Sequence, residues 1–325
     1  MPCIRRREFV ASALLATGSM GGMAWADGYP NRPIRLVVPY SPGGGSDFVG
    51  RLIAQKLTET AGWNVVVDNK AGAAGLIGTD AVAKSAPDGY TLFLADAAHA
   101  TNAAVQPKTP FDPIKDFAPL TLVGSSPQLL VAHPSFPANS LRELLALPRD
   151  RAGQFAVGTP GQGSGPHLLY ETLKLKTGME LVHVPYKGGS IALTDAVGGQ
   201  IPMVINSVPA CMPHIEAKRL KVLAIASAER HPKLPEVQTF SESVPGIVVS
   251  AWYGVMAPAK TPADVLQQLN AALNKVLDLP EVHARLAASF IDPMPRGPQA
   301  FSKYLNEEIA RWKSVVKQTG VTANS

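Results

Sequence analysis

The stretch IRLVVPYSPGGGSDFVG (residues 34–50) decides the fold of this chain. Its first five residues are mostly apolar and predict a buried strand, while apolar residues recur at helical spacing through residues 48–61. Between these two segments lies a loop of proline, glycine and hydroxyl residues, 39–47. A strand that enters a helix through such a loop is typical of a βαβ unit.

The same alternation of strand and helix continues along the chain and predicts two α/β lobes. In the first series, strands are expected at 65–67 and 91–94, with a helix at 77–84. Apolar segments at 120–123 and 129–132 are expected to pair. A second series follows, with helices expected at 141–147, 168–177 and 191–197 and strands at 155–157, 181–184, 203–205 and 222–226. We therefore expect parallel sheets.

The end of the chain predicts helices that cover a lobe already built. An apolar stretch at 247–256 leads into three helical patterns, one with a stripe of Phe301, Leu305, Ile309, Trp312 and Val316. The simplest topology places residues 27–128 and 248–325 in lobe one and residues 129–247 in lobe two. Two lobes joined by two crossing segments can close around a ligand.

Residues 1–26 are expected to be an export signal. Three arginines, at 5–7, precede a mostly apolar run, and the run ends in Ala24-Trp25-Ala26, a small-x-small cleavage pattern. The adjacent arginines favour the twin-arginine route, with a Sec signal as the alternative. The apolar run is too short and too rich in small residues for a stable membrane-spanning helix. We expect cleavage near Ala26 and a periplasmic protein.

Charge and cysteine content exclude several classes of function. Without residues 1–26 the chain has 27 Lys and Arg against 24 Asp and Glu, a net charge of only +3, and these charges are interspersed. Nucleic acid is therefore not an expected partner. Cys211 is the single cysteine after the signal, so it can form no internal disulfide and is expected to be a small buried apolar group.

Three glycine-rich loops are candidates for ligand binding. In open α/β sheets the ligand lies beyond the carboxyl ends of the strands, where loops enter helices. Loop 39–47 leaves its backbone N–H groups unhindered at a helix start, which favours an anion. Ser46 or Asp47 is expected to be the N-cap or to contact ligand. Asp47 would repel a carboxylate, so we expect it to organise the loop instead.

The other two loops are at residues 70–75 and 159–167. The first offers the same unhindered backbone, with a tight turn as the alternative. The second combines glycines with capping hydroxyls, and His167, expected about one turn into its helix, either reaches the cleft or packs beneath the loop. Tyr186, Lys187, Ser190 and Asn206 are further candidates at the ends of strands or before helices.

Motifs that would indicate catalysis are missing from the sequence. The loops at 39–47 and 159–167 do not complete a dinucleotide fingerprint, because Phe48 and Pro166 stand where glycine is needed. There is no nucleophile elbow, no Walker loop and no zinc-protease motif, and the histidines lack metal-ligand spacing. We therefore expect a protein that is not an enzyme and uses no cofactor and no metal.

Several ordered segments resemble one family of binding proteins. They are PIRLVVPY (33–40), GG-x-SD (43–47), APDGYTL (86–92), DP-x-x-DF (112–117), HVPYKG (183–188) and PHI (213–215). Together they resemble the Bug (Bordetella uptake gene) family, the periplasmic solute receptors of tripartite tricarboxylate transporters. The resemblance runs from about Pro33 to Val321.

The resemblance implies a type II periplasmic binding protein fold, no catalysis and a small carboxylate-bearing ligand held in a cleft between the lobes. It places one carboxylate at the first-lobe loops and the far end of the ligand at the second lobe. The residues expected at the site, from the loops and from the resemblance together, are Tyr40, Ser41, Gly43, Gly44, Ser46, Asp47, Gly72, Ala73, Ala74, Asp96, Thr159, Gly161, Gly163, Ser164, His167, Tyr186 and Asn206.

Two departures from the family pattern concern the ligand. Asn206 stands where the family often has aspartate, and Asp96-Ala97-Ala98 replaces small hydroxyl residues. We therefore expect a ligand other than the family's commonest kind, with Asp96 accepting a hydrogen bond from an amine or hydroxyl on it. The expected partners are this small organic acid and the integral membrane subunits of a transporter, and the protein is expected to be a monomer. A periplasmic sensor that presents its ligand state to a membrane receptor is the alternative.

Overall fold

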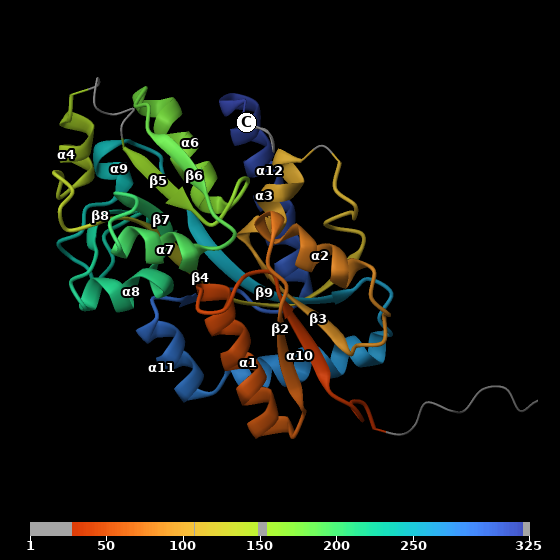
Figure 1. Ribbon diagram of the computed structural model, residues 1–325. Helices are drawn as coiled ribbons and strands as arrows, with labels where there is room; N and C mark the ends of the chain where they lie inside the picture. Colours follow the sequence, from red (N-terminus) through yellow and green to blue (C-terminus); the bar gives the residue numbers. More distant parts are fainter. Residues whose placement is uncertain (1–27, 107, 149–154, 321–325) are drawn as a thin grey trace, which may run out of the picture. The chain divides into compact units, whose positions relative to one another are not determined.

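A computed structural model describes residues 28–106, 108–148 and 155–320. All the described helices and strands belong to one compact unit, which begins at Arg32. The expected signal, residues 1–26, lies outside the described residues. Figure 1 shows the chain as a ribbon.

The described strands are β1 (Ile34–Val38), β2 (Val65–Asn69), β3 (Thr91–Asp96), β4 (Phe117–Ala132), β5 (Ala156–Thr159), β6 (Val182–Pro185), β7 (Met203–Ser207), β8 (Lys221–Ile225), β9 (Ser250–Pro258) and β10 (Asp292–Pro293). The described helices are α1 (Gly45–Ala61), the short 3₁₀ helix η1 (Ala73–Gly75), α2 (Leu76–Ala83), α3 (Ala97–Val105), α4 (Leu141–Ala146), α6 (Gly165–Thr177), α7 (Gly189–Val197), α8 (Val208–Glu216), α9 (Phe240–Ser243), α10 (Ala263–Leu277), α11 (Pro280–Ala288) and α12 (Pro298–Thr319).

The deciding segment folds as its sequence predicts. Ile34, Leu36, Val37 and Val38 are at most 1% exposed, as in a strand covered on both faces. Helix α1 ends at Gly62, whose left-handed conformation (φ 70°) lets its N–H donate to the Thr58 carbonyl. The expected α/β alternation is thereby confirmed.

The strands form a mixed sheet rather than the purely parallel ones expected. Pairs β1–β2, β1–β3, β5–β6 and β5–β7 are parallel. Strand β9 runs antiparallel to both β3 and β4, and β4 runs antiparallel to β7 and β8. The expectation of purely parallel sheets is wrong because β9 lies between β3 and β4 and runs opposite to both, and β4 runs opposite to β7 and β8.

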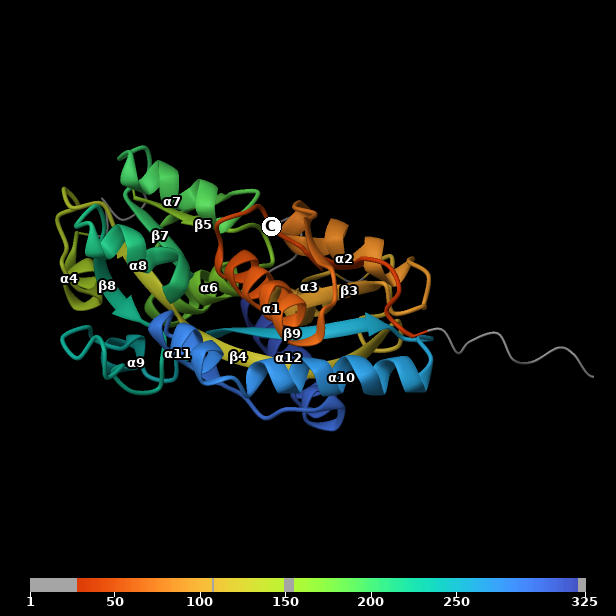
Figure 2. The same ribbon diagram turned by 90° about the horizontal axis from the view of Figure 1, so that it is seen from below.

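Strand β4 connects the two groups of parallel strands. The segments expected as a pair at 120–123 and 129–132 are wrong as two strands, because residues 117–132 form one continuous strand. Its first part pairs with β9 and its last five residues pair with β7. Figures 1 and 2 both show β4 and β9 running from the β1–β3 strands toward β5–β7. The strand order is β2-β1-β3-β9-β4-β7-β5-β6.

The C-terminal helices pack on the sheet as predicted. Four residues of the expected stripe on α12, Phe301, Leu305, Ile309 and Trp312, are at most 5% exposed, and α12 contacts α3 and β4. A Cβ on Gly254 of β9 would stand only 2.4 Å from the Phe301 ring. This glycine therefore allows the helix to approach the strand closely.

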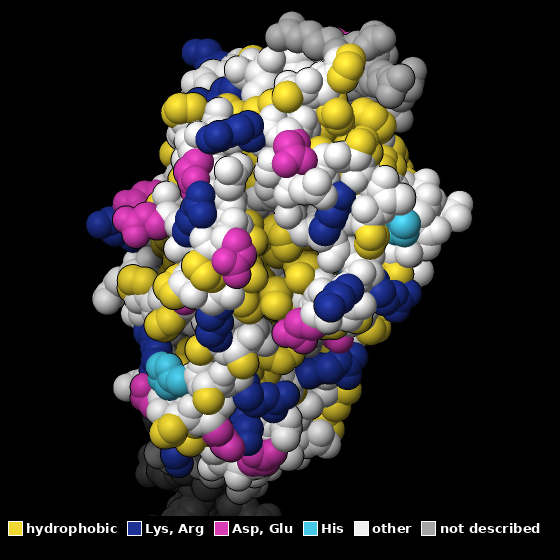
Figure 3. All heavy atoms as spheres, turned by 90° about the vertical axis from the view of Figure 1, so that its left-hand side faces the viewer, with side chains coloured by type: hydrophobic (Ala, Val, Ile, Leu, Met, Phe, Trp, Pro, Cys, Tyr) yellow, Lys and Arg dark blue, Asp and Glu magenta, His cyan; other side chains and the backbone are white. Residues whose placement is uncertain are grey.

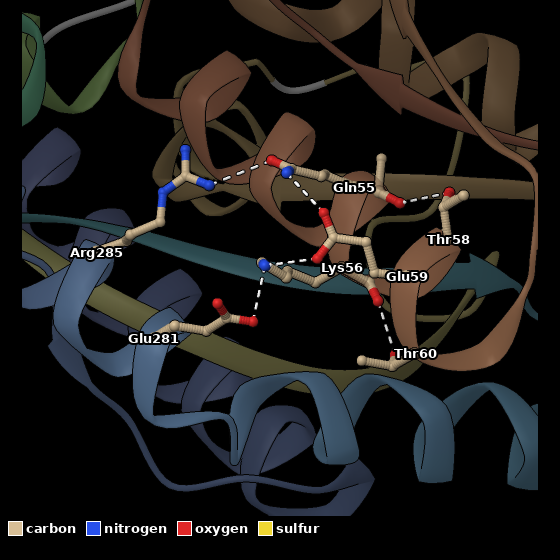
Figure 4. Close-up of polar contacts among 8 residues, drawn as sticks. Gln55, Lys56, Thr58, Glu59, Thr60, Glu281 and Arg285 are labelled. Atoms are coloured by element: carbon tan, nitrogen blue, oxygen red, sulfur yellow. Dashed lines mark hydrogen bonds and ion pairs between the residues drawn. The ribbon is translucent and has the colours of Figure 1, made fainter.

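A buried lysine joins α1 to α11. The Lys56 side chain is 8% exposed, and its Nζ lies 2.6 Å from Glu59 Oε2 and 2.7 Å from Glu281 Oε1. Arg285 of α11 donates to Gln55 of α1 over 3.2 Å. Figure 4 shows these side chains facing one another between the two helices. These contacts join α1 to α11.

The surface shows no field of one charge on the face that Figure 3 presents. Lys and Arg side chains are interspersed there with Asp and Glu. This agrees with the charge pattern of the sequence. In the described part of the chain, no helix has the length and hydropathy needed to span a bilayer.

Candidate functional site

Five helices begin around one cavity. The cavity has a volume of about 560 Å³, including its solvent-open mouth. Residues at the ends of β3 and β7, and in the loops that follow β1 and β5, contribute to its lining. Its lining consists of Tyr40, Ser41, Gly44, Gly45, Ser46, Asp96, Ala97, Ala98, Gln128, Pro160, Ser164, Gly165, Pro166, Gly189, Ser190, Asn206, Ser207, Ala251 and Tyr253. The lining combines apolar groups with a few polar ones, as the linings of small-molecule sites do.

Helix starts, rather than basic side chains, supply the positive groups of the cavity lining. Helices α1, α3, α6, α7 and α8 each contribute a residue of their first turn or their N-cap to the lining. The first N–H groups of a helix lack partners within the helix and carry the positive end of its dipole. None of the lining residues is Lys or Arg. The cavity is therefore suited to an anion that is bound by neutral donors.

Asp96 is the one acidic residue in this lining, and it is already solvated by the protein. Its Oδ2 accepts from Ser46 Oγ over 3.0 Å and its Oδ1 accepts from the Ala98 N–H over 3.0 Å. The Tyr40 hydroxyl also bonds to this carboxylate. Burial outweighs these bonds and raises the pKa of Asp96 to about 6. Asp96 is thus the N-cap of α3 as well as a cavity group.

Two tyrosines flank Asp96 across the floor of the cavity. Burial, together with the charge of Asp96, raises the pKa of Tyr40 well above its ordinary value. Burial likewise raises the pKa of Tyr253, whose hydroxyl bonds to the Ser207 side chain. Both phenols therefore remain protonated at neutral pH and can donate or accept a hydrogen bond.

The loop before α1 is organised by Asp47, as expected. Its carboxylate accepts from the Gly43 N–H over 2.9 Å, from Arg51 Nε over 2.9 Å and from Asn69 Nδ2 over 3.0 Å. Burial opposes ionisation, but these bonds prevail and lower the pKa of Asp47. Neither Asp47 nor Gly43 lines the cavity. The expectation of Ser46 or Asp47 as the N-cap is wrong: Gly44 is the N-cap, and Ser46 turns to Asp96.

The loop before α6 is supported by a pair of stacked histidines. His167 Nδ1 accepts from the Gly163 N–H over 3.0 Å, and its ring lies 4.2 Å from the His183 ring. His183 Nε2 in turn lies 2.7 Å from Thr159 Oγ1. Of the expected residues in this loop, Ser164 lines the cavity, whereas Thr159, Gly161, Gly163 and His167 do not. His167 packs beneath the loop, and it is the third residue of α6 rather than one turn into it, because the helix begins at Gly165.

The loop at 72–75 lies outside the cavity lining. Ala73 and Ala74 both have positive φ, and the Ala74 carbonyl accepts from Asn102 Nδ2 over 2.9 Å. A Cβ on Gly161 would stand 3.5 Å from the Ala74 side chain, so the loop packs against the loop before α6. Tyr186 is also outside the lining, since its hydroxyl donates to Asp195 over 2.8 Å.

Several lining residues were not expected from the sequence. Gln128 and Tyr253 lie within the apolar strands β4 and β9, and Ser207 ends β7. Gly189 lies in the first turn of α7, where a Cβ would stand 2.2 Å from Asn206 Nδ2. Gln128 could have been recognised from the sequence as a candidate, because it is a polar carboxamide inside the apolar segment 120–132.

The described residues contain no cluster of His, Cys, Asp or Glu that could hold a metal ion.

The fold and the cavity together define a class of protein. Two groups of parallel strands joined by the long strands β4 and β9, with helix starts from both groups around one cavity, have the architecture of a solute-binding protein. The model of the family described as "Tripartite tricarboxylate transporter family receptor" matches residues 49–321. The chain belongs to this receptor family.

Individual relatives agree with the family over nearly the whole chain. The chain is 38% identical to protein BugT of Bordetella pertussis over 314 residues, which is 96% of each protein. Among solved structures, the periplasmic binding protein BugD superimposes with a TM-score of 0.87 at 32% identity, covering 90% of this chain and 99% of BugD. MatC of Rhodopseudomonas palustris, solved with bound malate, has a TM-score of 0.84 at 33% identity, covering 89% of this chain and 100% of MatC. The expected family and fold are confirmed.

Proposed function

We propose that this receptor binds an organic acid with its carboxylate at the starts of α1 and α6. The single observation that supports this proposal most is the convergence of five helix N-termini on a cavity with no Lys or Arg in its lining. The Ser41 hydroxyl and the backbone N–H groups at the start of α1 can donate there, whereas the hydroxyls of Ser46 and Ser164 already donate to Asp96 and to the Gly161 carbonyl. The malate in the related MatC is also a carboxylate. The residues of loop 72–75, together with Gly43, Asp47, Gly161 and Gly163, support the site from behind.

We also propose that binding closes two lobes, residues 27–128 with 248–325 and residues 129–247. Contacts across this boundary support the proposal. The Tyr253 hydroxyl bonds to the Ser207 side chain, and a Cβ on Gly188 would stand 3.5 Å from Ser41 Oγ. A ligand between such groups stabilises the closed form by as much as it prefers that form.

The proposed function also includes export, location and delivery of the ligand to a transporter. The signal at residues 1–26 is removed near Ala26, and the mature receptor works in the periplasm as a monomer. It delivers its ligand to the integral membrane subunits of a tripartite transporter and performs no catalysis. Incubation with a bound acid should therefore return that acid unchanged, as measured by mass spectrometry.

The test is a binding screen on the mature protein. Native mass spectrometry identifies any solute retained through purification, and a thermal-shift series covers mono-, di- and tricarboxylates at fixed ionic strength. A ligand that binds only the folded state at a hundred times its Kd adds about 2.7 kcal/mol of stability. Chloride and sulfate serve as control anions. A protein that responded to sulfate as strongly as to every organic acid would contradict the proposal.

A further inference from the structure

Asp96 is an acidic residue in the lining of the cavity that we assign to an anion. Among the described residues, the lining contains no Lys, Arg, His or Glu that would offset or share its charge. Asp96 is 8% exposed, so water screens that charge poorly. An organic acid at the start of α1 therefore shares a shielded cavity with a carboxylate, and two like charges in one site disfavour the ionised form of each other.

The hydrogen bonds of Asp96 decide which of its oxygens can hold a proton. Oδ1 accepts from the Ala98 N–H over 3.0 Å, and a backbone N–H can only donate. Oδ2 accepts from the Ser46 hydroxyl over 3.0 Å, and a hydroxyl can reverse and accept instead. The Tyr40 hydroxyl can remain a donor, because a protonated carboxyl keeps acceptor lone pairs. A proton on Asp96 therefore lies on Oδ2 and is donated to Ser46 Oγ.

The ionisation of Asp96 thus decides what the Ser46 hydroxyl presents to the cavity. While Asp96 is ionised, the one hydroxyl proton of Ser46 points to Oδ2 and only lone pairs are left for a ligand. Lone pairs do not bind an anion. Once Oδ2 carries a proton and donates it to Ser46 Oγ, the Ser46 proton is released and can donate into the cavity that Ser46 lines.

We infer that each organic acid is bound together with one proton, which is taken up from solvent by Asp96 Oδ2 and turns the Ser46 hydroxyl toward the ligand carboxylate. The new O–H bond neutralises Asp96, so the site gains no net charge when the acid enters. This inference rests on the carboxylate receptor proposed above and adds how the site accommodates the negative charge of its ligand.

The titratable groups around Asp96 leave it as the acceptor of this proton. Burial already raises the pKa of Asp96 to about 6, so a modest further rise allows protonation at neutral pH. Tyr40, in the loop after β1, and Tyr253, the partner of Asp96 on β9, have pKa values raised by burial and stay protonated. On α3, burial lowers the pKa of His99 to about 4, so its ring stays neutral.

The charged groups on the other helices next to Asp96 have partners of their own. On α1, bonds from Arg51 and Gly43 outweigh the burial of Asp47, lower its pKa and keep it ionised. On α6, which packs against α3, His167 Nδ1 accepts from the Gly163 N–H, and His167 lies outside the cavity lining. These groups are unchanged in a variant of Asp96, so a comparison with that variant isolates the proton held by Asp96.

The test counts protons by calorimetry on the mature protein. Acetate, succinate, malate, glutarate and adipate are titrated at about pH 7 in PIPES and in imidazole, buffers whose ionisation enthalpies differ. The tightest probe is expected to take up at least about half a proton, and its Kd to rise up to about tenfold per pH unit above that pH. A smaller uptake by a probe that binds overturns the inference and leaves the proposed function standing. Binding by none of the probes overturns both.

A second set of probes tests whether an ammonium group, rather than a proton, neutralises Asp96. Aspartate and glutamate carry one ammonium group more than succinate and glutarate. Under the inference, they bind no more tightly than these counterparts. An amino acid that binds more tightly than its counterpart, and takes up no proton, overturns the inference.

Asp96→Asn fixes the proposed arrangement permanently. The amide Oδ1 still accepts from the Ala98 N–H, and Nδ2 donates to Ser46 Oγ as the protonated carboxyl would. The variant is expected to bind without proton uptake and, at about pH 8, about tenfold or more tighter than the native protein. Asp68→Asn on β2, outside the lining, is the matched control and is expected to keep the native uptake. Weaker binding by Asp96→Asn, or native uptake in it, overturns the inference.

Ser46→Ala tests the transfer through the hydroxyl. Added to Asp96→Asn, it removes the donor that faces the ligand, so the affinity is expected to fall about tenfold, as for one lost hydrogen bond. Urea unfolding of the double variant checks that it is folded at the temperature of the titration. Equal affinity with and without the Ser46 hydroxyl overturns the inference.

Discussion

The Ser46 hydroxyl donates to Asp96 Oδ2 over 3.0 Å and so joins the first turn of α1 to the end of β3. Both residues lie in the cavity lining and both are at most 8% exposed. The bond orients two helix starts with respect to each other. It also places the one acidic group of the lining where its ionisation is costly.

Asp96→Asn is expected to change how stability depends on pH. Burial raises the pKa of Asp96 from 3.8 to about 6, so the folded state holds this proton more tightly than the unfolded state. The free energy of unfolding therefore falls as the pH rises from about 4 to about 6, by about 3 kcal/mol, and stays lower above that range. Asparagine removes this loss.

Urea unfolding at about pH 4 and about pH 7 measures the effect. The stability of Asp96→Asn relative to the native protein is expected to rise by about 3 kcal/mol between the two conditions. Using the difference between the two proteins cancels the other carboxylates, several of which have lowered pKa values. Parallel pH profiles for the two proteins would contradict the prediction.

Asp47→Ala is expected to loosen the loop before α1. It removes the acceptor of Gly43, Arg51 and Asn69, and the expected loss of unfolding free energy is about 1–2 kcal/mol at neutral pH. Because the pKa of Asp47 is lowered, this contribution is present at neutral pH and is lost as the pH falls through the folded pKa. Asp68→Ala in β2 is the control, since Asp68 has only 3.6 Å ion pairs with Arg35 and Lys70. An equal effect of both changes in urea unfolding would refute this role.

Gly189→Ala is expected to abolish ligand binding with a smaller effect on folding. The new Cβ would stand 2.2 Å from Asn206 Nδ2 and force that side chain to move within the cavity. Gly198→Ala at the other end of α7 is the control, because its φ of −79° accepts a side chain and the nearest atom is 3.4 Å away. Calorimetry with the best ligand of the screen should show loss of binding in the first variant alone. Unchanged affinity in Gly189→Ala would show that Asn206 is free to move.

Lys56→Met is expected to lower stability more than the loss of a surface ion pair does. Lys56 is 8% exposed and joins Glu59 of α1 to Glu281 of α11, so its removal breaks an ion pair between two helices (Figure 4). Lys84→Met is the matched control, since Lys84 is 64% exposed and pairs with Asp80 within one helix. Exposed ion pairs of that kind contribute little to the free energy of unfolding. The midpoint of urea unfolding should fall further for Lys56→Met, and equal midpoints would contradict the role given to it.

Local sequence patterns were enough to predict most elements and the loops that surround the site. Apolar runs bounded by glycine and proline predicted β1, β3 and β7, because a buried strand needs apolar residues on both faces. The position of loop 39–47 before a helix predicted a helix start with free N–H groups. Helical spacing likewise predicted the stripe of α12. These features depend on neighbouring residues, so they can be recognised in the sequence alone.

Other features depend on contacts between distant residues, and only the tertiary structure decided them. Continuous pairing with β9 and β7 makes residues 117–132 a single strand. The stacking of His167 on His183 holds the His167 ring beneath the loop before α6, and the bond from Asn102 to Ala74 holds loop 72–75 outside the cavity lining. Asn206 Nδ2 and Gln128 Oε1, which have no partner among the described residues, belong to residues 78 positions apart in the sequence, and the solvation of a buried polar atom depends on every segment that surrounds it. The sequence by itself thus determined the class of fold and the helix starts that attract an anion, whereas the tertiary structure decided which donors and acceptors face the ligand.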